Sequence, residues 1–204
     1  QAVSRGLGDV YKRQTQYSIC EGAIKIDELA EYCKTNKIKC LGIADSFNLC
    51  GALEFSEKLS KVGTHPIIGT QISFKYKGFK GLIPLIAKNY DGYKNIIKLS
   101  SKSFLENSET TTPHCEIEDL LNNSKGIIVL TGSIRCLIGS LFNKGLFNEI
   151  EELLIELKKK FENNIYIEIQ RHNDLNEKDF ENYNLQISET VSYTHLRAHE
   201  TLLD

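Results

Sequence analysis

The sequence predicts an α/β protein in which parallel strands alternate with outer helices. Short apolar runs of strand length alternate with longer segments whose apolar residues recur at helical spacing. Polar or charged residues follow several of these runs directly, as Asp45 follows the run 38–44. Alternation of this kind indicates βαβ units, which collect functional residues at the carboxyl ends of their strands. Five or six such units exceed the needs of an average open sheet and indicate an incomplete barrel.

Composition excludes several classes of protein. The chain has 204 residues, enough for one large domain or two small ones, and its 41% apolar and 25% charged content is that of a protein with a packed core. A net charge of -2 gives no electrostatic reason for tight nucleic-acid binding by this chain alone. Six cysteines form neither a CxxC pair nor a zinc-type spacing, so we interpret them as reduced thiols of a cytoplasmic protein. Neither a membrane span nor a signal peptide is visible, and no membrane partner is expected.

The two ends differ from the interior. Residues 1–14 and 191–204 lack its Ile, Lys and Asn richness and resemble translated adapter sequence. We therefore expect non-native ends and a native domain at 15–190 that is truncated on both sides. The absence of methionine agrees with a fragment. His195 and His199 form an H-x-x-x-H pair that could bind zinc on a helix, but this end offers no supporting glutamate at the required place.

The first half of the interior contains three predicted helices and three predicted strands. Acidic residues Asp27 and Glu28 stand early in the first helix, where the helix dipole favours them, and Gly63 closes the second. A turn is expected at 76–78 between the second and third strands. The helices are predicted at 24–33, 51–62 and 90–99, and the strands at 38–44, 66–74 and 81–87.

The second half continues the alternation after a polar surface loop at 101–113. Its clearest element is an amphipathic helix at 146–161, whose charged face is expected to be solvated. The other predicted elements are helices at 116–121, 134–142 and 173–187 and strands at 126–130 and 165–169.

Polar residues at the strand ends are the candidate functional group. A cluster of His, Asp and Glu at this edge of a barrel could hold divalent metals that activate water against a phosphate. The cluster here is poor, since two carboxylates and one imidazole stand among weaker Ser, Thr and Gln donors. Its members are Glu21, Asp45, Ser46, Thr70, Gln71, Thr131 to Ser133, Arg171 and His172.

The carboxylate and histidine candidates also have structural alternatives. Asp45 could cap the following helix, Glu21 with its following glycine could form a surface turn, and His172 could bind a neighbouring loop. His65 and His114 lie beside prolines and are expected in solvent. The sequence contains no P-loop, no GxGxxG motif and no G-x-S-x-G elbow, so those nucleotide and hydrolase classes are unsupported.

Three stretches together resemble one family: 17–25, then 42–55 continuing into 66–69, and finally 168–172. In order and spacing they resemble the PHP (polymerase and histidinol phosphatase) domain of the bacterial DNA polymerase III alpha subunit family. The turn Asn-Leu-Cys-Gly at 48–51 and the strand Pro-Ile-Ile-Gly at 66–69 resemble that polymerase branch in particular. The resemblance implies a distorted barrel of seven βα units, of which this chain holds most.

The resemblance also implies a metal site, matched in part. Glu21 matches an acidic ligand position, Asp45 matches the Asp of a Thr-Asp-His motif, and His172 matches a frequent family histidine. We expect these three residues to form a vestigial metal cluster.

Other ligand positions depart from the family pattern. Lys12 and Gln14 stand where the family has His-x-His, within the adapter-like end. Ser46 replaces the ligating histidine beside Asp45, Gln71 stands in place of a glutamate, and Leu82 aligns where a histidine is expected. The closing Asp-x-His of the family lies beyond the native end. These departures make metal-dependent hydrolysis doubtful.

By resemblance, the parent protein is a DNA-directed DNA polymerase that uses Mg²⁺ held by acids of another domain. For this chain we expect no catalytic residue, no cofactor and a scaffold role, docking the proofreading exonuclease subunit and other replicase subunits; DNA would be reached through the parent. The alternative is an active metal-dependent PHP phosphoesterase or 3′–5′ exonuclease, with Zn²⁺ or Mn²⁺ bound. A third hypothesis is an α/β binding module with Asp45 as a helix cap.

Overall fold

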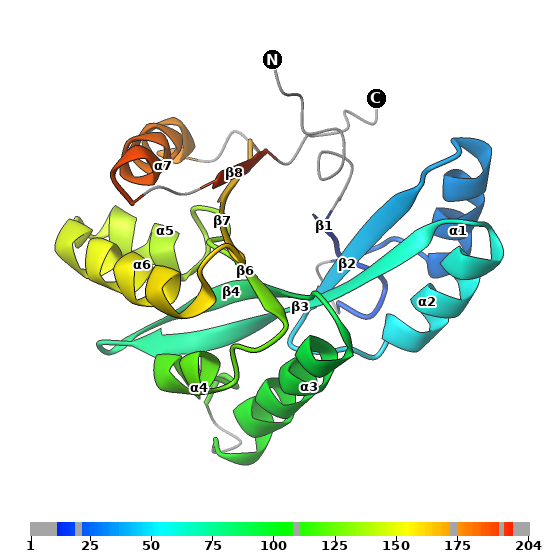
Figure 1. The fold of residues 1–204 in the computed structure, drawn as a ribbon, viewed down its shortest axis with the longest axis horizontal. Coiled ribbons are helices and arrows are strands. Elements are labelled where there is room, and N and C mark those ends of the chain that lie inside the picture. The colour runs from blue at the N-terminus through cyan, green and yellow to red at the C-terminus, as the bar shows by residue number, and fades with distance from the viewer. Residues whose placement is uncertain (1–11, 19–21, 108–110, 172–174, 192–193, 198–204) are drawn as a thin grey trace.

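A computed structural model describes residues 12–18, 22–107, 111–171, 175–191 and 194–197 (Figure 1). The helices are α1 (Ile26–Thr35), α2 (Ala52–Lys61), α3 (Tyr90–Leu105), α4 (Ile117–Asn122), α5 (Leu137–Asn143), α6 (Phe147–Phe161) and α7 (Glu177–Val191). The strands are β1 (Lys12–Arg13), β2 (Cys40–Ser46), β3 (His65–Tyr76), β4 (Phe79–Ala87), β5 (Cys115–Glu116), β6 (Ile127–Leu130), β7 (Ile165–Ile169) and β8 (Thr194–Arg197).

The strands form one curled mixed sheet, a half-barrel with helices on its outside (Figure 1). Its order is β1-β2-β3-β4-β6-β7-β8, and the short β5 pairs with β3 off this path. In Figure 1, α1 and α2 cover the β2 side of the sheet, whereas α5, α6 and α7 gather on the side of β6 and β7. The predicted α/β class and incomplete barrel are confirmed.

The prediction of an all-parallel sheet is wrong at β4. This strand is antiparallel to both of its neighbours, β3 and β6. The cause is the connection: only Lys77 and Gly78 separate β3 from β4, and both have positive φ, 47° and 85°. Such a turn makes a hairpin, whereas a parallel pair would need a long crossover. The sequence predicts the turn at Tyr76-Lys77-Gly78, and its short length is what makes the two strands antiparallel.

The largest differences from the predicted boundaries are at α3 and α7. Helix α3 continues to Leu105, so the first residues of the predicted loop 101–113 are helical. Helix α7 covers Glu177–Val191, displaced from the predicted 173–187. The strand β7 matches its predicted bounds, and α6 begins one residue later than expected. The adapter-like ends contribute β1, which pairs with β2, and β8, which pairs with β7; the domain boundaries stay a prediction.

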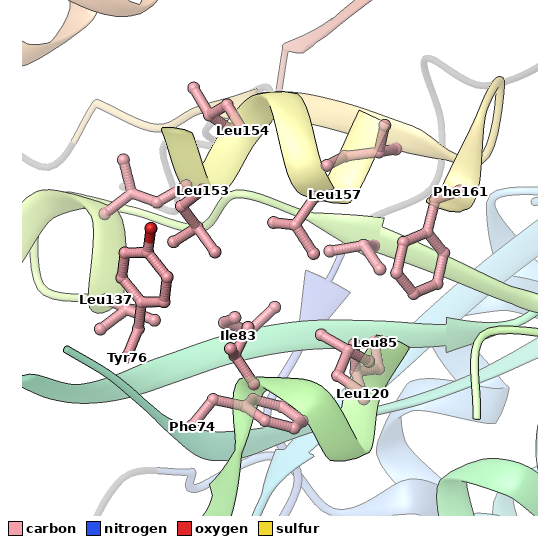
Figure 2. Packing of buried hydrophobic residues seen from close by; sticks show 14 of the residues in the cluster. Phe74, Tyr76, Ile83, Leu85, Leu120, Leu137, Leu153, Leu154, Leu157 and Phe161 are labelled. Atoms are coloured by element: carbon pink, nitrogen blue, oxygen red, sulfur yellow. The ribbon is translucent and has the colours of Figure 1, made fainter. Parts of the chain in front are cut away.

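Two hydrophobic clusters stabilise the domain. The smaller one joins α1 and α2 to β2 through residues such as Ile26, Phe55 and Leu59. The larger one fills the space between the rest of the sheet and α3 to α7. Figure 2 shows its centre, where Leu153 and Leu157 of α6 point toward Ile83 and Leu85 of β4. Burial of such side chains is the main stabilising contribution to the fold.

Among the helices that the structure describes, none combines the length and apolar character needed to cross a bilayer. Five of the cysteines are described, and each is a free thiol: Cys33, Cys40, Cys50, Cys115 and Cys136.

Replacing Leu153 by Ala should lower the free energy of unfolding by about 3 kcal/mol, because it leaves a cavity beneath α6. Urea denaturation followed by circular dichroism measures this loss. The matched control is Leu53→Ala on α2, where the side chain is 71% exposed and the change should stay within about 0.5 kcal/mol. Equal losses for the two variants would contradict the assignment of the core.

Candidate functional site at the strand ends

The carboxylate of Asp45 is buried at the end of β2, with only 1% of the residue exposed. It accepts hydrogen bonds from the backbone N–H of Thr15 at 2.6 Å, the hydroxyl of Thr15 at 2.8 Å and the hydroxyl of Ser18 at 2.7 Å. The Ser18 oxygen in turn accepts from the N–H of Ser46 at 3.1 Å. Asp45 therefore ties the segment 14–18, which follows β1, to the carboxyl end of β2.

Strand register explains this meeting. Lys12 and Arg13 pair with Gly42 and Ile43, and the same parallel register carried two residues further sets Thr15 beside Asp45. On the other side Asp45 pairs with Thr70 of β3. The Thr70 hydroxyl donates to the backbone oxygen of Asp45 at 2.7 Å. Thr70 and Gln71 were expected at a strand end but lie within β3, which continues into the hairpin.

The helix-cap alternative for Asp45 is not supported. The N-cap residue of α2 is Gly51, which has no side chain, and no side-chain hydrogen bond caps this helix. The Asp45 carboxylate instead binds Thr15 and Ser18, which precede it in the chain by 30 and 27 residues.

Neighbouring residues of a strand face opposite sides of the sheet, so Ser46 lies on the face opposite Asp45. Ser46 pairs in register with Gln71, which shares its face. The amide of Gln14 donates to the Ser46 hydroxyl at 3.0 Å, and the amide of Gln71 donates to the Ala44 oxygen at 3.2 Å. Leu82 of β4 is on this face too, since it pairs with Ser73 of β3.

The described positions at which this chain departs from the family's ligand pattern thus lie on one face of neighbouring strands, opposite Asp45. Four described side chains lie there: the amides of Gln14 and Gln71, the hydroxyl of Ser46 and the aliphatic side chain of Leu82. Amides and hydroxyls are weak ligands for Zn²⁺ or Mn²⁺ compared with imidazole and carboxylate. The described donors of this face therefore do not fit a transition-metal centre.

The turn after β2 explains the Asn-Leu-Cys-Gly motif. The Asn48 amide donates to the backbone oxygens of Tyr17 at 3.0 Å and Ser46 at 2.9 Å, and its oxygen accepts from the N–H of Cys50 at 3.0 Å. At Gly51 a Cβ atom would lie 2.8 Å from the Tyr17 ring, so a larger residue would push that ring aside. The motif shapes the turn and holds the segment 14–18, with no reactive group required.

A surface network extends this anchoring to the helices. The Tyr17 hydroxyl donates to Glu54 of α2 at 2.7 Å, and Lys58 joins Glu54 at 2.6 Å and Asp27 of α1 at 2.5 Å. The hydrogen bond to Glu54 raises the pKa of Tyr17, while Lys58 and then Tyr17 lower the pKa of Glu54. Asp27 and Glu54 together raise the pKa of Lys58. The side chains of Lys58 and Glu54 are 31% and 30% exposed, and that of Asp27 is 79% exposed. Solvent therefore screens these ion pairs, and they contribute more to side-chain orientation than to the stability of the fold.

A second polar group lies at the ends of β6 and β7, on the other side of β4 from Asp45. The Thr131 hydroxyl accepts the N–H of Glu168 at 3.0 Å, and the Gln170 amide donates to the Glu168 carboxylate at 2.6 Å. Arg171 forms a two-point ion pair with Glu181 of α7, at 2.6 and 3.0 Å. Arg171 is therefore engaged with α7, whereas the sequence had grouped it with Asp45.

A shallow hollow opens beside this second group. It is lined by Ser133, Ile134, Glu168, Ile169, Gln170, Glu177, Phe180, Glu181 and Asn184. The sequence gives no signal for Glu168, although it stands inside the motif 168–172, because it falls within the predicted strand 165–169, whereas the candidates Arg171 and His172 follow that strand. Glu177 and Glu181 follow on a helix and carry no strand-end signal.

Two of the three residues of the predicted vestigial cluster, Glu21 and His172, lie outside the described residues, as does His199. Within the described ranges, no group of three or more His, Cys, Asp or Glu side chains is arranged to hold a metal ion. Asp45 is thus the one member whose surroundings are known, and its known partners are hydroxyl and amide donors.

Comparison with known proteins decides the family. The family model described as "PHP domain" matches residues 11–172, well over half of the chain. The chain belongs to the PHP family. The part of this PHP domain that matches the family model contains all of the elements from β1 to β7.

Curated relatives of this PHP domain are named DNA polymerase III subunit alpha. That of Rickettsia felis is 35% identical over 174 residues, and that of Caulobacter vibrioides is 33% identical over 180 residues; each alignment covers 83% of the chain. That of Rickettsia prowazekii is 33% identical and covers 89%. The chain spans only 14–16% of the length of these relatives.

Among solved structures, the domain is similar to a protein assigned as a metal-dependent phosphoesterase from Bifidobacterium adolescentis. The TM-score is 0.62 at 12% sequence identity, covering 94% of this chain and 86% of the other. At this identity the likeness concerns the fold alone, and it agrees with the half-barrel described above.

A double-mutant cycle tests the role of Asp45 as an anchor. Asp45→Asn should lower the free energy of unfolding by about 2–3 kcal/mol and Ser18→Ala by about 1.5 kcal/mol, since each breaks hydrogen bonds to a buried carboxylate. Because the two side chains touch, the double variant should lose about 1 kcal/mol less than the sum. Chemical denaturation measures all three values.

The control for this cycle is Ser101→Ala on the exposed side of α3, expected within about 0.5 kcal/mol of the parent. Strictly additive effects, or a Ser18 variant as stable as the control, would contradict the anchoring role.

Proposed function

We propose that this chain is the PHP domain of a replicative DNA polymerase of the alpha-subunit type, and that the domain is a degenerate, non-catalytic scaffold. Three relatives at 33–35% identity, each named DNA polymerase III subunit alpha, support the first part. The parent activity would be DNA-directed nucleotidyl transfer in DNA replication. Its Mg²⁺ would be held by acids of a separate polymerase domain.

The degenerate role rests on the chemistry of the two faces of β2. On one face, Gln14, Ser46 and Gln71 occupy the implied ligand positions and bind one another or the backbone. On the other face, the charge of Asp45 is already compensated by donors from Thr15 and Ser18. A metal ion bound here would have to displace these hydrogen bonds and would gain only weak ligands in return.

A domain with this site can still serve the polymerase as a docking surface. We assign it the role of holding the proofreading exonuclease subunit next to the polymerase, within the replicase assembly. Contact with DNA would come through the rest of the parent protein, in keeping with a net charge of -2 for this chain.

The alternative function is an active metal-dependent PHP phosphoesterase or 3′–5′ exonuclease using Zn²⁺ or Mn²⁺. It draws on the carboxylates around the hollow at the end of β7, Glu168, Glu177 and Glu181. Against it, Glu181 is already paired with Arg171, and Glu168 accepts the Gln170 amide. The scaffold role agrees better with these contacts.

Metal analysis separates the two functions. The domain, expressed with its natural flanking sequence and dialysed against Zn²⁺ or Mn²⁺, should retain well below one metal ion per chain by elemental analysis. It should release no nucleotides from a labelled single-stranded 3′ end in either metal. One metal ion bound per chain, together with metal-dependent cleavage of the labelled strand, would contradict the scaffold proposal.

The docking role is tested with the purified proofreading exonuclease subunit. Isothermal titration should show saturable binding to the same preparation, and the double variant Ser46→Ala, Gln71→Ala should bind within twofold of the parent, because no metal chemistry is involved. Absence of binding to both proteins would overturn the assigned partner. Loss of binding in the variant alone would assign the docking surface to the strand ends.

A further inference from the structure

Helix α3 carries an apolar stripe on the side that faces solvent. Tyr90 is 72% exposed, Ile97 40%, Phe104 52% and Leu105 83%. The first three recur every seven residues, about two helical turns apart, so they form a line on one face roughly 21 Å long. Figure 1 shows α3 at the lower margin of the molecule, beside α4.

The opposite face of α3 fixes the helix in place. Ile96 and Leu99 are fully buried in the larger hydrophobic cluster, and α3 contacts β3 and β4. The stripe is therefore held outward by a rigid support. Its apolar surface amounts to roughly 450 Å², within the size range in which exposed patches on single proteins are often functional.

A row of lysines runs along one edge of the stripe. Lys94, Lys98 and Lys102 follow one another at intervals of four residues. Lys94 pairs with Asp91 at 3.3 Å and Lys102 with Asp119 at 2.6 Å. Within the part of the chain that the structure describes, no carboxylate pairs with Lys98, at the middle of the row. At the level of Ile97, the surface thus carries a positive charge about 100° further round the helix, on the flank of the stripe.

We propose that this face of α3 docks an amphipathic helix of a partner protein, with apolar residues in its seam and acidic residues along the flank that meets Lys98. The apolar positions Tyr90, Ile97 and Phe104 recur every seven residues, as one of the two seam positions of a heptad does, and the lysine row begins beside them at Lys94. Apolar contact at Tyr90, Ile97 and Phe104 supplies affinity, and the lysine row selects the sign of the partner's charge.

Charge argues against a second copy of this chain as the occupant. An antiparallel pair related by a two-fold axis through Ile97 would set each Tyr90 against a Phe104, but it would bring Lys98 next to its own symmetry mate. Two like charges at the centre of the contact are unfavourable. Single-stranded nucleic acid fits less well, since Ile97 and Leu105 offer no stacking surface and two of the three lysines are already paired.

The inference does not depend on the proposed function, because α3 contributes no residue to the strand-end groups. It is tested on the full chain with two designed 21-residue helical peptides, labelled with fluorescein. Both carry leucine at the seam positions, and one has glutamate, the other lysine, along the flanks. By fluorescence anisotropy the glutamate peptide should bind at least tenfold tighter, and about 1 M NaCl should reduce that preference.

Substitutions on α3 test whether its exposed face is the surface that binds the peptides. Ile97→Glu should weaken binding of the glutamate peptide at least tenfold, and Lys98→Glu should reverse the preference between the peptides. Ile155→Glu on α6 is the matched control, since that side chain is 51% exposed but lies away from α3, and it should bind as the parent does. Circular dichroism confirms that each variant is folded.

Equal binding of both peptides, no binding by either, or an unchanged Ile97→Glu variant would overturn the proposal. A dimer seen by light scattering that Ile97→Glu dissociates would replace the partner with a second copy. Binding of an oligothymidine that Phe104→Ala abolishes would replace it with nucleic acid.

Discussion

The hairpin of β3 and β4 is the constraint on which the rest of the domain depends. These are the two longest strands, and between them they pair with β2, β5 and β6. Their register follows from a two-residue turn in which Lys77 and Gly78 have positive φ. Since one face of the hairpin carries Ile72, Phe74, Ile83 and Leu85 into the larger core, a slip of one residue would turn these side chains outward. The hairpin also separates the two polar groups at the strand ends.

The alternation of side chains along β2 divides two tasks between adjacent residues. Asp45 faces the segment 14–18 and works as an anchor, whereas Ser46 faces the side on which the family resemblance implies metal ligands. A residue that looks catalytic by its place in a motif is thus integrated into the fold through three donors. Its burial and its hydrogen bonds are sufficient physical reasons for an acid at this position.

Much of the fold could be predicted from the sequence, because it is encoded in local periodicity. The helix α6 and the strand β7 were found almost to the residue, since apolar spacing and length both indicate them. Strand direction at β4 was missed because periodicity carries no direction; only the length of the turn at 77–78 does. The strand-end residues were predicted to form one group, but Arg171 forms an ion pair with Glu181 of α7 and lies apart from Asp45. The partners of Asp45 could not be foreseen, since Thr15 and Ser18 reach it through pairing of distant strands.

The hydrogen bonds around Ser46 affect how readily mutations could restore a metal site at this position. Under the proposed function, one substitution to histidine at this position would add a single ligand to a face that otherwise presents the amides of Gln14 and Gln71 and the aliphatic side chain of Leu82. One imidazole among amides binds metal too weakly to improve activity, and it would break the hydrogen bond from Gln14. Several changes would have to occur together before any of them became advantageous. A lineage that has lost the site in this way is separated from its hydrolytic relatives by a fitness valley, and sequence drift alone would not be expected to lead back across it.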